Sequence, residues 1–283
     1  MSNPSPLLTF EEPPLNEVAL AVQFQANAVD YTQAARLREQ LKDMYPKRQE
    51  QPARPPMEES FAPPTTRPPF EIQVIPAPTI PRLWFLSEDE ALLVQVQHDL
   101  LAYNWRRRPG GQEYPRYEAI RAAIEHGLTQ LDAVVREDSE AGVIPNWCEI
   151  TYINHVEPQD DETEPPPIRD VLEGVDTPPL EGFLPRLEDA QVGFRFRIPG
   201  KEQPRGRLNF TTIAAHRNAD SVPIWAITLT ARVLAENGDG IDRALEALDV
   251  GHEWVVNGFR ELTSGKMHER WRIREDGNGV TSS

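Results

Sequence analysis

The residues whose types and spacing could do chemistry gather in one short stretch, LAYNWRRRPGGQEYPRYE, at positions 101–118. The stretch combines arginines with aromatic side chains, namely Arg106, Arg107, Arg108, Arg116, Tyr103, Trp105, Tyr114 and Tyr117. Guanidinium groups beside aromatic rings are typical of surfaces that bind phosphate groups or single-stranded nucleic acid. The same pattern arises where a strand ends in solvated charge while its aromatic residues pack inward, and the acidic segment 157–164 offers partners for such arginines. Both interpretations stay open, and only the run of three arginines goes beyond what folding requires.

A second candidate is His252, which lies within LDVGHEWVVNGF on the apolar stripe of a predicted helix. There an imidazole could act as a general acid or base, hold a ligand, or be a buried structural histidine. Glu253 points about 100° away around the helix and cannot share a site with it. No second histidine follows one helical turn later, and the other five histidines lack metal-ligand spacing. The sequence therefore predicts no metal site, while His252 joins the arginine stretch as a candidate binding residue.

Motifs for covalent chemistry are missing from the sequence. Cys148 lies in the strand pattern WCEITYI, where a structural thiol is far more common than a catalytic one. Neither the nucleophile elbow G-x-S-x-G nor the phosphate-binding loops G-x-x-x-x-G-K-[ST] and G-x-G-x-x-G occurs. We therefore expect no cofactor, assign no catalytic residue, and favour a protein that is not an enzyme.

Composition narrows the classes of partner. The chain has 283 residues with 29 Lys and Arg against 45 Asp and Glu, a formal net charge of −16. Such a charge repels nucleic acid and anionic lipid at long range, so a nucleic-acid site would have to be a local basic patch. One cysteine allows no internal disulfide, and neither a signal-peptide pattern nor an apolar run of about 18 residues is present. These features predict a cytoplasmic protein without a membrane span.

Prolines divide the chain. They are concentrated in residues 46–81 and in the acidic segment 157–191, and proline cannot occupy a helix interior or a central strand. We interpret the first stretch as a linker or excursion, in which FEIQVI at 70–75 could form a short strand, and the second as a mobile surface loop. Residues 1–45 are expected to add a strand and a helix to the core, and residues 277–283 to form a disordered tail.

The two regions between these stretches, residues 82–156 and 192–276, repeat one pattern. Each shows three strands, an amphipathic helix and a further strand, which in the second region is ERWRIRED. In the first region, His98 and Asp99 have the character of a hairpin turn. The duplicated pattern predicts an α+β fold with antiparallel sheet and with helices covering one face.

Several blocks together resemble a sporadically distributed family of uncharacterised bacterial proteins of roughly this length. They are the strand PPLNEVALAVQF, the block YNWRR followed by YPRYE, the strand CEITYINHV, and the helix LDVGHEWVVNGFRELT before Trp271. The resemblance covers most of the chain outside the proline-rich stretches, and the central block is its most specific part. It implies a bacterial origin but no particular activity, because none is established for the family. The patchy distribution is typical of defence-associated or toxin–antitoxin genes.

We therefore expect a non-catalytic interaction or regulatory module that binds a protein partner or forms a homo-oligomer. The alternative is an enzyme that acts on a phosphorylated or nucleic-acid substrate. In that enzyme Arg106–Arg108 would hold the phosphate, and His252 or His155 would serve as acid or base. A third class, a nucleic-acid binder without catalysis, requires salt-dependent binding despite the charge of −16.

Overall fold

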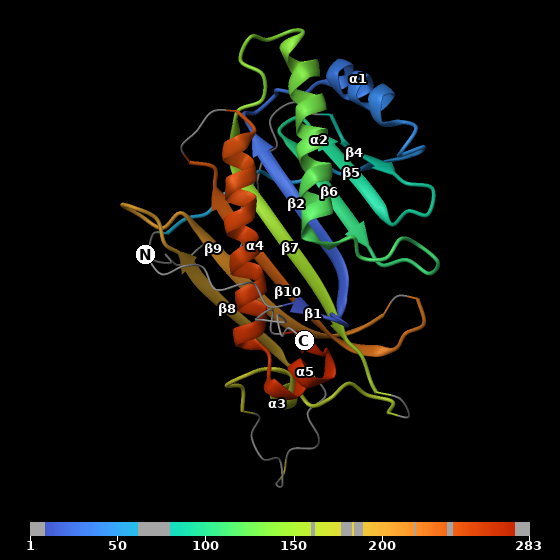
Figure 1. Ribbon diagram of the computed structural model, residues 1–283, viewed down its shortest axis with the longest axis vertical. Coiled ribbons are helices and arrows are strands. Elements are labelled where there is room, and N and C mark those ends of the chain that lie inside the picture. The colour runs from blue at the N-terminus through green and yellow to red at the C-terminus, as the bar shows by residue number, and fades with distance from the viewer. Residues whose placement is uncertain are drawn as a thin grey trace, which may run out of the picture.

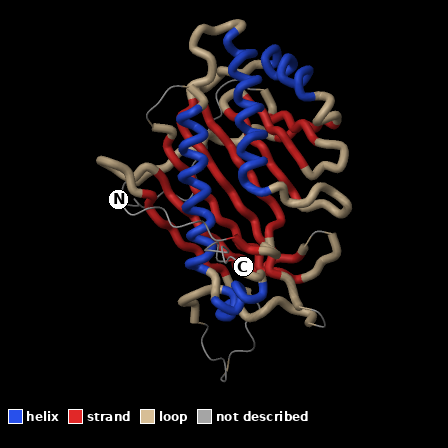
Figure 2. The backbone as a smooth tube through the Cα atoms, in the orientation of Figure 1, coloured by secondary structure: helices blue, strands red, loops and turns tan. Residues whose placement is uncertain are grey.

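The computed structural model describes residues 9–61, 80–159, 162–176, 183, 189–217, 219–236 and 240–274. These residues form one large antiparallel sheet with helices on one face, so the predicted α+β class is confirmed (Figure 1, Figure 2). Among the described helices none is both long and apolar enough to cross a membrane.

The main sheet has nine strands in the order β3-β4-β5-β6-β2-β7-β10-β9-β8, and each neighbouring pair is antiparallel. The strands are β2 (Leu15–Phe24), β3 (Lys47–Gln51), β4 (Arg82–Leu86), β5 (Leu92–Gln97), β6 (Leu100–Arg106), β7 (Pro145–Val156), β8 (Gln191–Ile198), β9 (Gly206–His216) and β10 (Pro223–Leu234). The helices are α1 (Tyr31–Leu41), α2 (Arg116–Arg136), α3 (Ile168–Val171), α4 (Asp242–Leu262) and α5 (Gly265–Arg270). The long strands β2 and β7 lie side by side at the centre and join two similar halves.

The two halves repeat with a different phase from the predicted one. In each half a long strand comes first, three strands of a meander follow, and a helix ends the unit: β2 with β4–β6 and α2, then β7 with β8–β10 and α4. The prediction that ERWRIRED forms the closing strand of the second half was wrong for the main sheet. Residues 265–270 form α5 instead, and β11 (Ile273–Arg274) pairs with β1 (Thr9–Phe10) in a separate two-stranded sheet.

The helices α2 and α4 cover the same face of the sheet, which we call the helix face (Figure 2). The periodic apolar residues of α2, from Ile120 to Val135, are buried against β6 and β2, as their spacing predicts. On α4 the buried positions include Leu245, Leu248 and Val255, which pack over β7 and β10. The predicted hairpin turn is confirmed, because β5 ends at Gln97 and β6 begins at Leu100.

The proline-rich stretches contain more regular structure than expected. Strand β3 falls within the predicted linker 46–81 and pairs with β4, whereas the suggested strand 70–75 lies outside the described residues. Within 157–191, α3 is packed rather than mobile: Ile168, Val171 and Leu172 are buried, and α3 contacts α5. The predicted tail 277–283 also lies outside the described residues.

No helix of the described residues lies on the face opposite α2 and α4, and we call it the open face. Its side chains alternate with those of the helix face along each strand. Polar or small residues predominate on it, such as Gln23 on β2, Gln97 on β5 and Glu149 on β7. Residues 52–61, which we call the strap, run over part of this face without regular secondary structure.

Candidate functional site

Helix α2 begins part-way along the sheet, so it leaves the ends of β2 and β7 uncovered beside α4 (Figure 1). A cavity of about 510 Å³ lies there, within the size range of small-molecule sites. Its apolar lining includes Phe10, Leu15, Val255, Val256 and Phe259. Its polar lining comprises Tyr114, Tyr117, Tyr152, Asn154 and His252, with Arg116, Glu118 and Arg274 as its charged residues. We call this cavity the tyrosine pocket.

His252 projects from α4 and stacks on Tyr117 of α2, with ring centroids 3.7 Å apart and 7° between the ring planes. The hydroxyl of Tyr117 donates a hydrogen bond of 2.7 Å to Oδ1 of Asp249, which lies about one helical turn before His252 on α4. Burial lowers the pKa of His252 to about 4, although the carboxylates of Glu118 and Asp249 favour its protonated form. The imidazole is therefore neutral at pH 7.

A short chain of hydrogen bonds leads to the same imidazole. The hydroxyl oxygens of Tyr114 and Tyr152 are 3.1 Å apart, and the Tyr152 hydroxyl is 3.2 Å from Nδ1 of His252. Burial raises the pKa of both hydroxyls, so both keep their protons. When the Tyr152 hydroxyl donates to Nδ1, Nε2 carries the ring proton. When the direction of these hydrogen bonds reverses and Nδ1 donates to Tyr152, Nε2 becomes an acceptor. Because no hydrogen-bond partner of Nε2 is found in the described part of the chain, His252 can offer a ligand either role.

Arg116, the first residue of α2, has a backbone φ of 70°. This left-handed conformation costs a non-glycine residue about 1 kcal/mol, and strain of this kind concentrates at binding sites. A terminal nitrogen of its guanidinium group lies 3.5 Å from the carbonyl oxygen of Phe10, and the group lies 5.9 Å from the ring centroid of Tyr114. The strained turn therefore places a cation beside the polar wall of the tyrosine pocket.

The charges around the tyrosine pocket balance. Arg116 and Glu118 are both exposed and carry opposite charges. Nε of Arg274 lies 2.7 Å from a carboxylate oxygen of Glu11, so that cation already has a partner. The buried polar groups are uncharged. The pocket is thus apolar and hydrogen-bonding, without a net charge to neutralise an ion.

Four of the residues singled out from the sequence line this pocket: Tyr114, Arg116, Tyr117 and His252. A fifth, Trp105, supports its wall, because its ring lies 5.2 Å from that of Tyr114 and its indole nitrogen donates a 2.8 Å hydrogen bond to the carbonyl oxygen of Gln112. The aromatic residues of the YNWRR and YPRYE blocks therefore belong together in space.

The remaining candidates lie elsewhere: Tyr103, Arg106, Arg107 and Arg108. Tyr103 packs against Tyr45, with ring centroids 6.5 Å apart. Arg106 lies on the open face, 5.5 Å from the ring centroid of Trp84, and burial lowers the pKa of its guanidinium group. The two arginines that follow are exposed and form no ion pair with any described residue. Asp160 and Asp161, suggested as partners, lie outside the described residues. The run of arginines therefore does not line the pocket that contains His252.

Sequence reasoning missed the contribution of β7. Its inward-facing positions are Cys148, Ile150, Tyr152, Asn154 and Val156, and all five are buried. Two of these side chains, Tyr152 and Asn154, are polar. A polar side chain is rarely buried on a core strand unless it has a hydrogen-bond partner. Two polar residues at successive inward positions of a core strand, Tyr152 and Asn154, were the signal that could have located the pocket.

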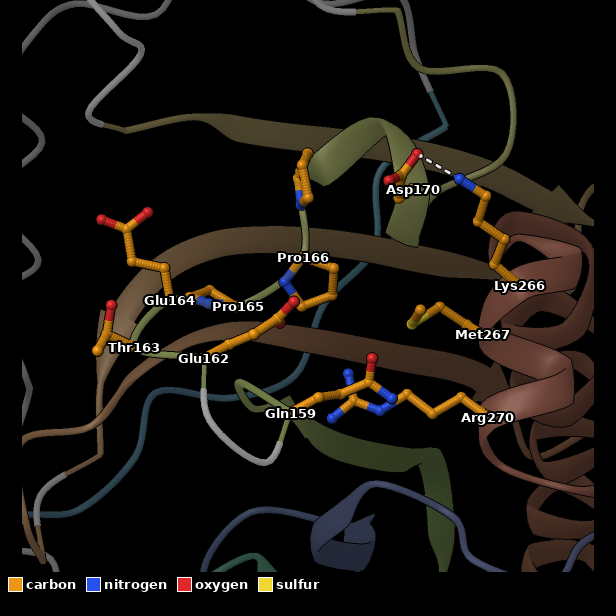
Figure 3. Close-up of a pocket in the computed structure, with 11 residues that line it drawn as sticks. Gln159, Glu162, Thr163, Glu164, Pro165, Pro166, Asp170, Lys266, Met267 and Arg270 are labelled. Carbon is orange, nitrogen blue, oxygen red and sulfur yellow. Dashed lines mark hydrogen bonds and ion pairs between the residues drawn. The ribbon is translucent and has the colours of Figure 1, made fainter.

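A second hollow, of about 590 Å³, lies between residues 159–170 and α5 (Figure 3). Its charged groups include Asp170 and Lys266, whose carboxylate oxygen and ammonium nitrogen are 3.1 Å apart. Lys266 is largely exposed, so this ion pair is solvated and screened. The tyrosine pocket is the better candidate because its hydrogen-bonding groups are buried and fixed.

The described residues offer neither a metal centre nor a reactive thiol. No group of three histidine, cysteine, aspartate or glutamate side chains with metal-binding geometry occurs among them. Cys148 is buried, its sulfur lies 3.5 Å from the carbonyl oxygen of Ala244, and burial raises the pKa of the thiol. A protonated, buried thiol is a poor nucleophile.

Comparison with known proteins gives no relative: no family model, curated protein or solved structure matches this chain. The resemblance carried by YNWRR, YPRYE and CEITYIN therefore stays a prediction.

Proposed function

We propose that this protein is a non-catalytic binding module that recognises an uncharged, partly apolar group in the tyrosine pocket. The observation that carries the proposal is the set of buried polar groups that line the cavity. Tyr114, Tyr152 and His252 are linked by hydrogen bonds, and all three are neutral at pH 7. Groups of this kind recognise a ligand by hydrogen bonding, whereas a buried ion would be costly without a counter-charge.

The ligand class follows from the lining. Phe10, Leu15 and Phe259 offer contact to an apolar body, and Nε2 of His252 offers one adaptable hydrogen bond. A planar, neutral compound with one amide, hydroxyl or ring N–H group satisfies both demands. Such a ligand, or a partner's side chain of the same chemistry, would make the protein a regulatory module whose interactions depend on occupancy of the pocket.

The enzyme alternative is less well supported. It requires the run of arginines to act on the same substrate as a histidine, but the run lies outside the tyrosine pocket that contains His252. Of the run, only Arg107 lies close enough to His155 to act on its pKa, and the nearby carboxylate of Glu157 already pairs with Arg217 at 2.5 Å.

A fragment screen tests the proposal. Neutral heteroaromatic fragments and phosphorylated fragments of similar size are added to the full chain, and binding is followed through the NMR signals of the His252 ring. We expect neutral fragments to shift these signals. Val256→Trp, which fills the pocket, should abolish the shifts, while Glu253→Trp, at an exposed position on the same helix, should not. Binding by phosphorylated fragments alone would contradict the proposal.

A further inference from the structure

The strap crosses the open face of the sheet in an extended conformation. Its contacts begin at Gln97 of β5 and end at Arg207 of β9 and Arg197 of β8. From Arg54 to Phe61 an extended chain spans at most ~25 Å, about the width of five strands. The strap emerges beside β9 at the left of Figure 1. It therefore lies across the strands rather than along one of them.

The backbone of the strap is held by side chains. No backbone–backbone hydrogen bond joins residues 52–61 to the rest of the described chain. Gln97 instead accepts from the N–H of Arg54 at 2.9 Å and donates to its carbonyl oxygen at 3.1 Å. Gln23 accepts from the N–H of Met57 and donates to its carbonyl oxygen at 3.2 Å. Each glutamine thus contacts both backbone groups of one strap residue, as a neighbouring strand would.

The spacing of these contacts matches the strap sequence. Arg54 and Met57 are three residues apart, and Pro55 and Pro56 separate them. A polyproline II helix has three residues per turn, so residues three apart present their backbone groups to the same side. The two glutamines are therefore placed to hold an extended, proline-containing segment.

Specific pockets receive three strap side chains. Arg54 pairs with Glu149 at 3.0 Å. Met57 is buried among Ala21, Leu100, Ala102 and Trp147. Glu59 lies 2.8 Å from Nε of Arg207 and 3.3 Å from a terminal nitrogen of Arg232. The face selects a cation, an apolar side chain three residues later, and a carboxylate two residues after that.

Glu149 is the charged centre of this arrangement. Its side chain is 7% exposed and also lies 2.6 Å from Nε of Arg232. Burial alone would raise the pKa of Glu149, but Arg54 and Arg232 more than offset this and hold it below its usual value. When Arg54 leaves, one buried carboxylate loses one of its two cations, so a replacement cation is favoured at the same place.

The strap is also an insertion that the sheet does not need. Gln51 at the end of β3 pairs directly with Arg82 at the start of β4, a position that a hairpin turn of about two to five residues could bridge. Residues 52–61, which follow β3, instead leave the edge of the sheet and cross most of the open face. Detaching the strap therefore changes neither the connection nor the register of β3 and β4.

We propose that the open face is a recognition groove for an extended partner peptide with the pattern Arg-Pro-Pro-Met-x-Glu, and that the strap is its intramolecular occupant. A partner protein that presents this pattern displaces the strap and takes over its contacts. The contacts are made by side chains of the face, which serve equally for a segment of another chain. This surface is separate from the tyrosine pocket, which lies on the helix face.

A fluorescent peptide of residues 52–61, PARPPMEESF, tests the proposal. It is titrated into the full chain and into a variant with a weakened strap, Arg54→Ala, Met57→Ala and Glu59→Ala together. The strap competes at an effective concentration of about 1 mM, so we expect the peptide to bind the variant at least tenfold more tightly than wild type. Adding Glu149→Gln to the variant should weaken binding at least tenfold, and a peptide with Arg54→Glu and Met57→Asp should not bind.

Three results would overturn the proposal. One is no binding of PARPPMEESF to a strap variant whose circular dichroism and melting show a folded protein. The second concerns hydrogen exchange of the wild-type protein, a measurement that remains informative if the variant fails to fold. We expect excess peptide to speed the exchange of the Arg54 and Met57 amides while the amides of the sheet stay protected. If the Arg54 and Met57 amides exchange only on global unfolding, the strap is part of the core and the proposal fails. The third is a wild-type dimer lost in the strap variant, which would make a second copy the occupant.

Discussion

Replacing His252 by phenylalanine should remove a pH-dependent loss of stability from the protein. The ordinary pKa of 6.5 in the unfolded chain falls to about 4 in the folded state. Between these values the unfolded chain binds more protons than the folded one, so stability is complete above pH 6.5 and declines as the pH falls towards 4. At pH 5 the expected loss is about 2 kcal/mol, and it approaches about 3 kcal/mol at pH 4.

Phenylalanine keeps the stacking on Tyr117 but cannot bind a proton. At pH 7.5 the variant should be less stable by about 1 kcal/mol, because Tyr152 loses a hydrogen-bond partner. At pH 5 it should instead be more stable than wild type by about 1 kcal/mol. Urea unfolding at both pH values measures this reversal, and the other histidines cancel in the difference. A stability difference that does not change between pH 7.5 and pH 5, or an NMR titration that gives His252 a pKa near 6.5, would refute the reasoning.

Substitutions at four further positions probe other parts of the structure through urea unfolding. Arg116→Gly should be neutral or stabilise by up to ~1 kcal/mol because glycine relieves the left-handed φ, whereas Arg116→Ala should destabilise; equal effects would argue against strain there. Arg107→Ala and Arg108→Ala should each change stability by less than ~0.5 kcal/mol, since both residues are exposed, and a larger loss would reveal a partner. Glu149→Gln should destabilise by ~2 kcal/mol, a value reduced because its arginine partners are about one-third exposed; no loss would show that the ion pairs are not formed.

The local elements of the fold were accessible from the sequence because each carries its own periodicity. The apolar stripes of α2 and α4 and the alternation in β2, β5 and β6 are repeated over several turns or residue pairs. Strand β3 was missed because its sequence, KRQEQ, is entirely polar, as suits the edge of a sheet. The supposed closing strand was misplaced because Ile273 and Arg274 alternate over too short a length to specify a partner.

The candidate site was only partly predictable because its parts meet through non-local pairing. His252 and Tyr117 stood out by residue type, but their stacking depends on α2 and α4 lying on the same face. Tyr152 enters the site only because β7 pairs with β2 at the centre of the sheet, which no local pattern specifies. The run of arginines was the strongest signal by composition, yet Arg106 is already engaged with Trp84 on the other face.

The central claim is that the tyrosine pocket recognises an uncharged group, and one matched pair of compounds tests it most directly. Benzamide and benzoate have nearly the same shape, but only benzoate carries a charge at pH 7. Each is titrated into the wild-type protein while the NMR signals of the His252 ring are recorded, with Val256→Trp as the filled-pocket control. The account predicts that benzamide shifts these signals at lower concentration than benzoate does and that neither compound shifts them in the control. Tighter binding of benzoate, or no shift with either compound, would contradict it.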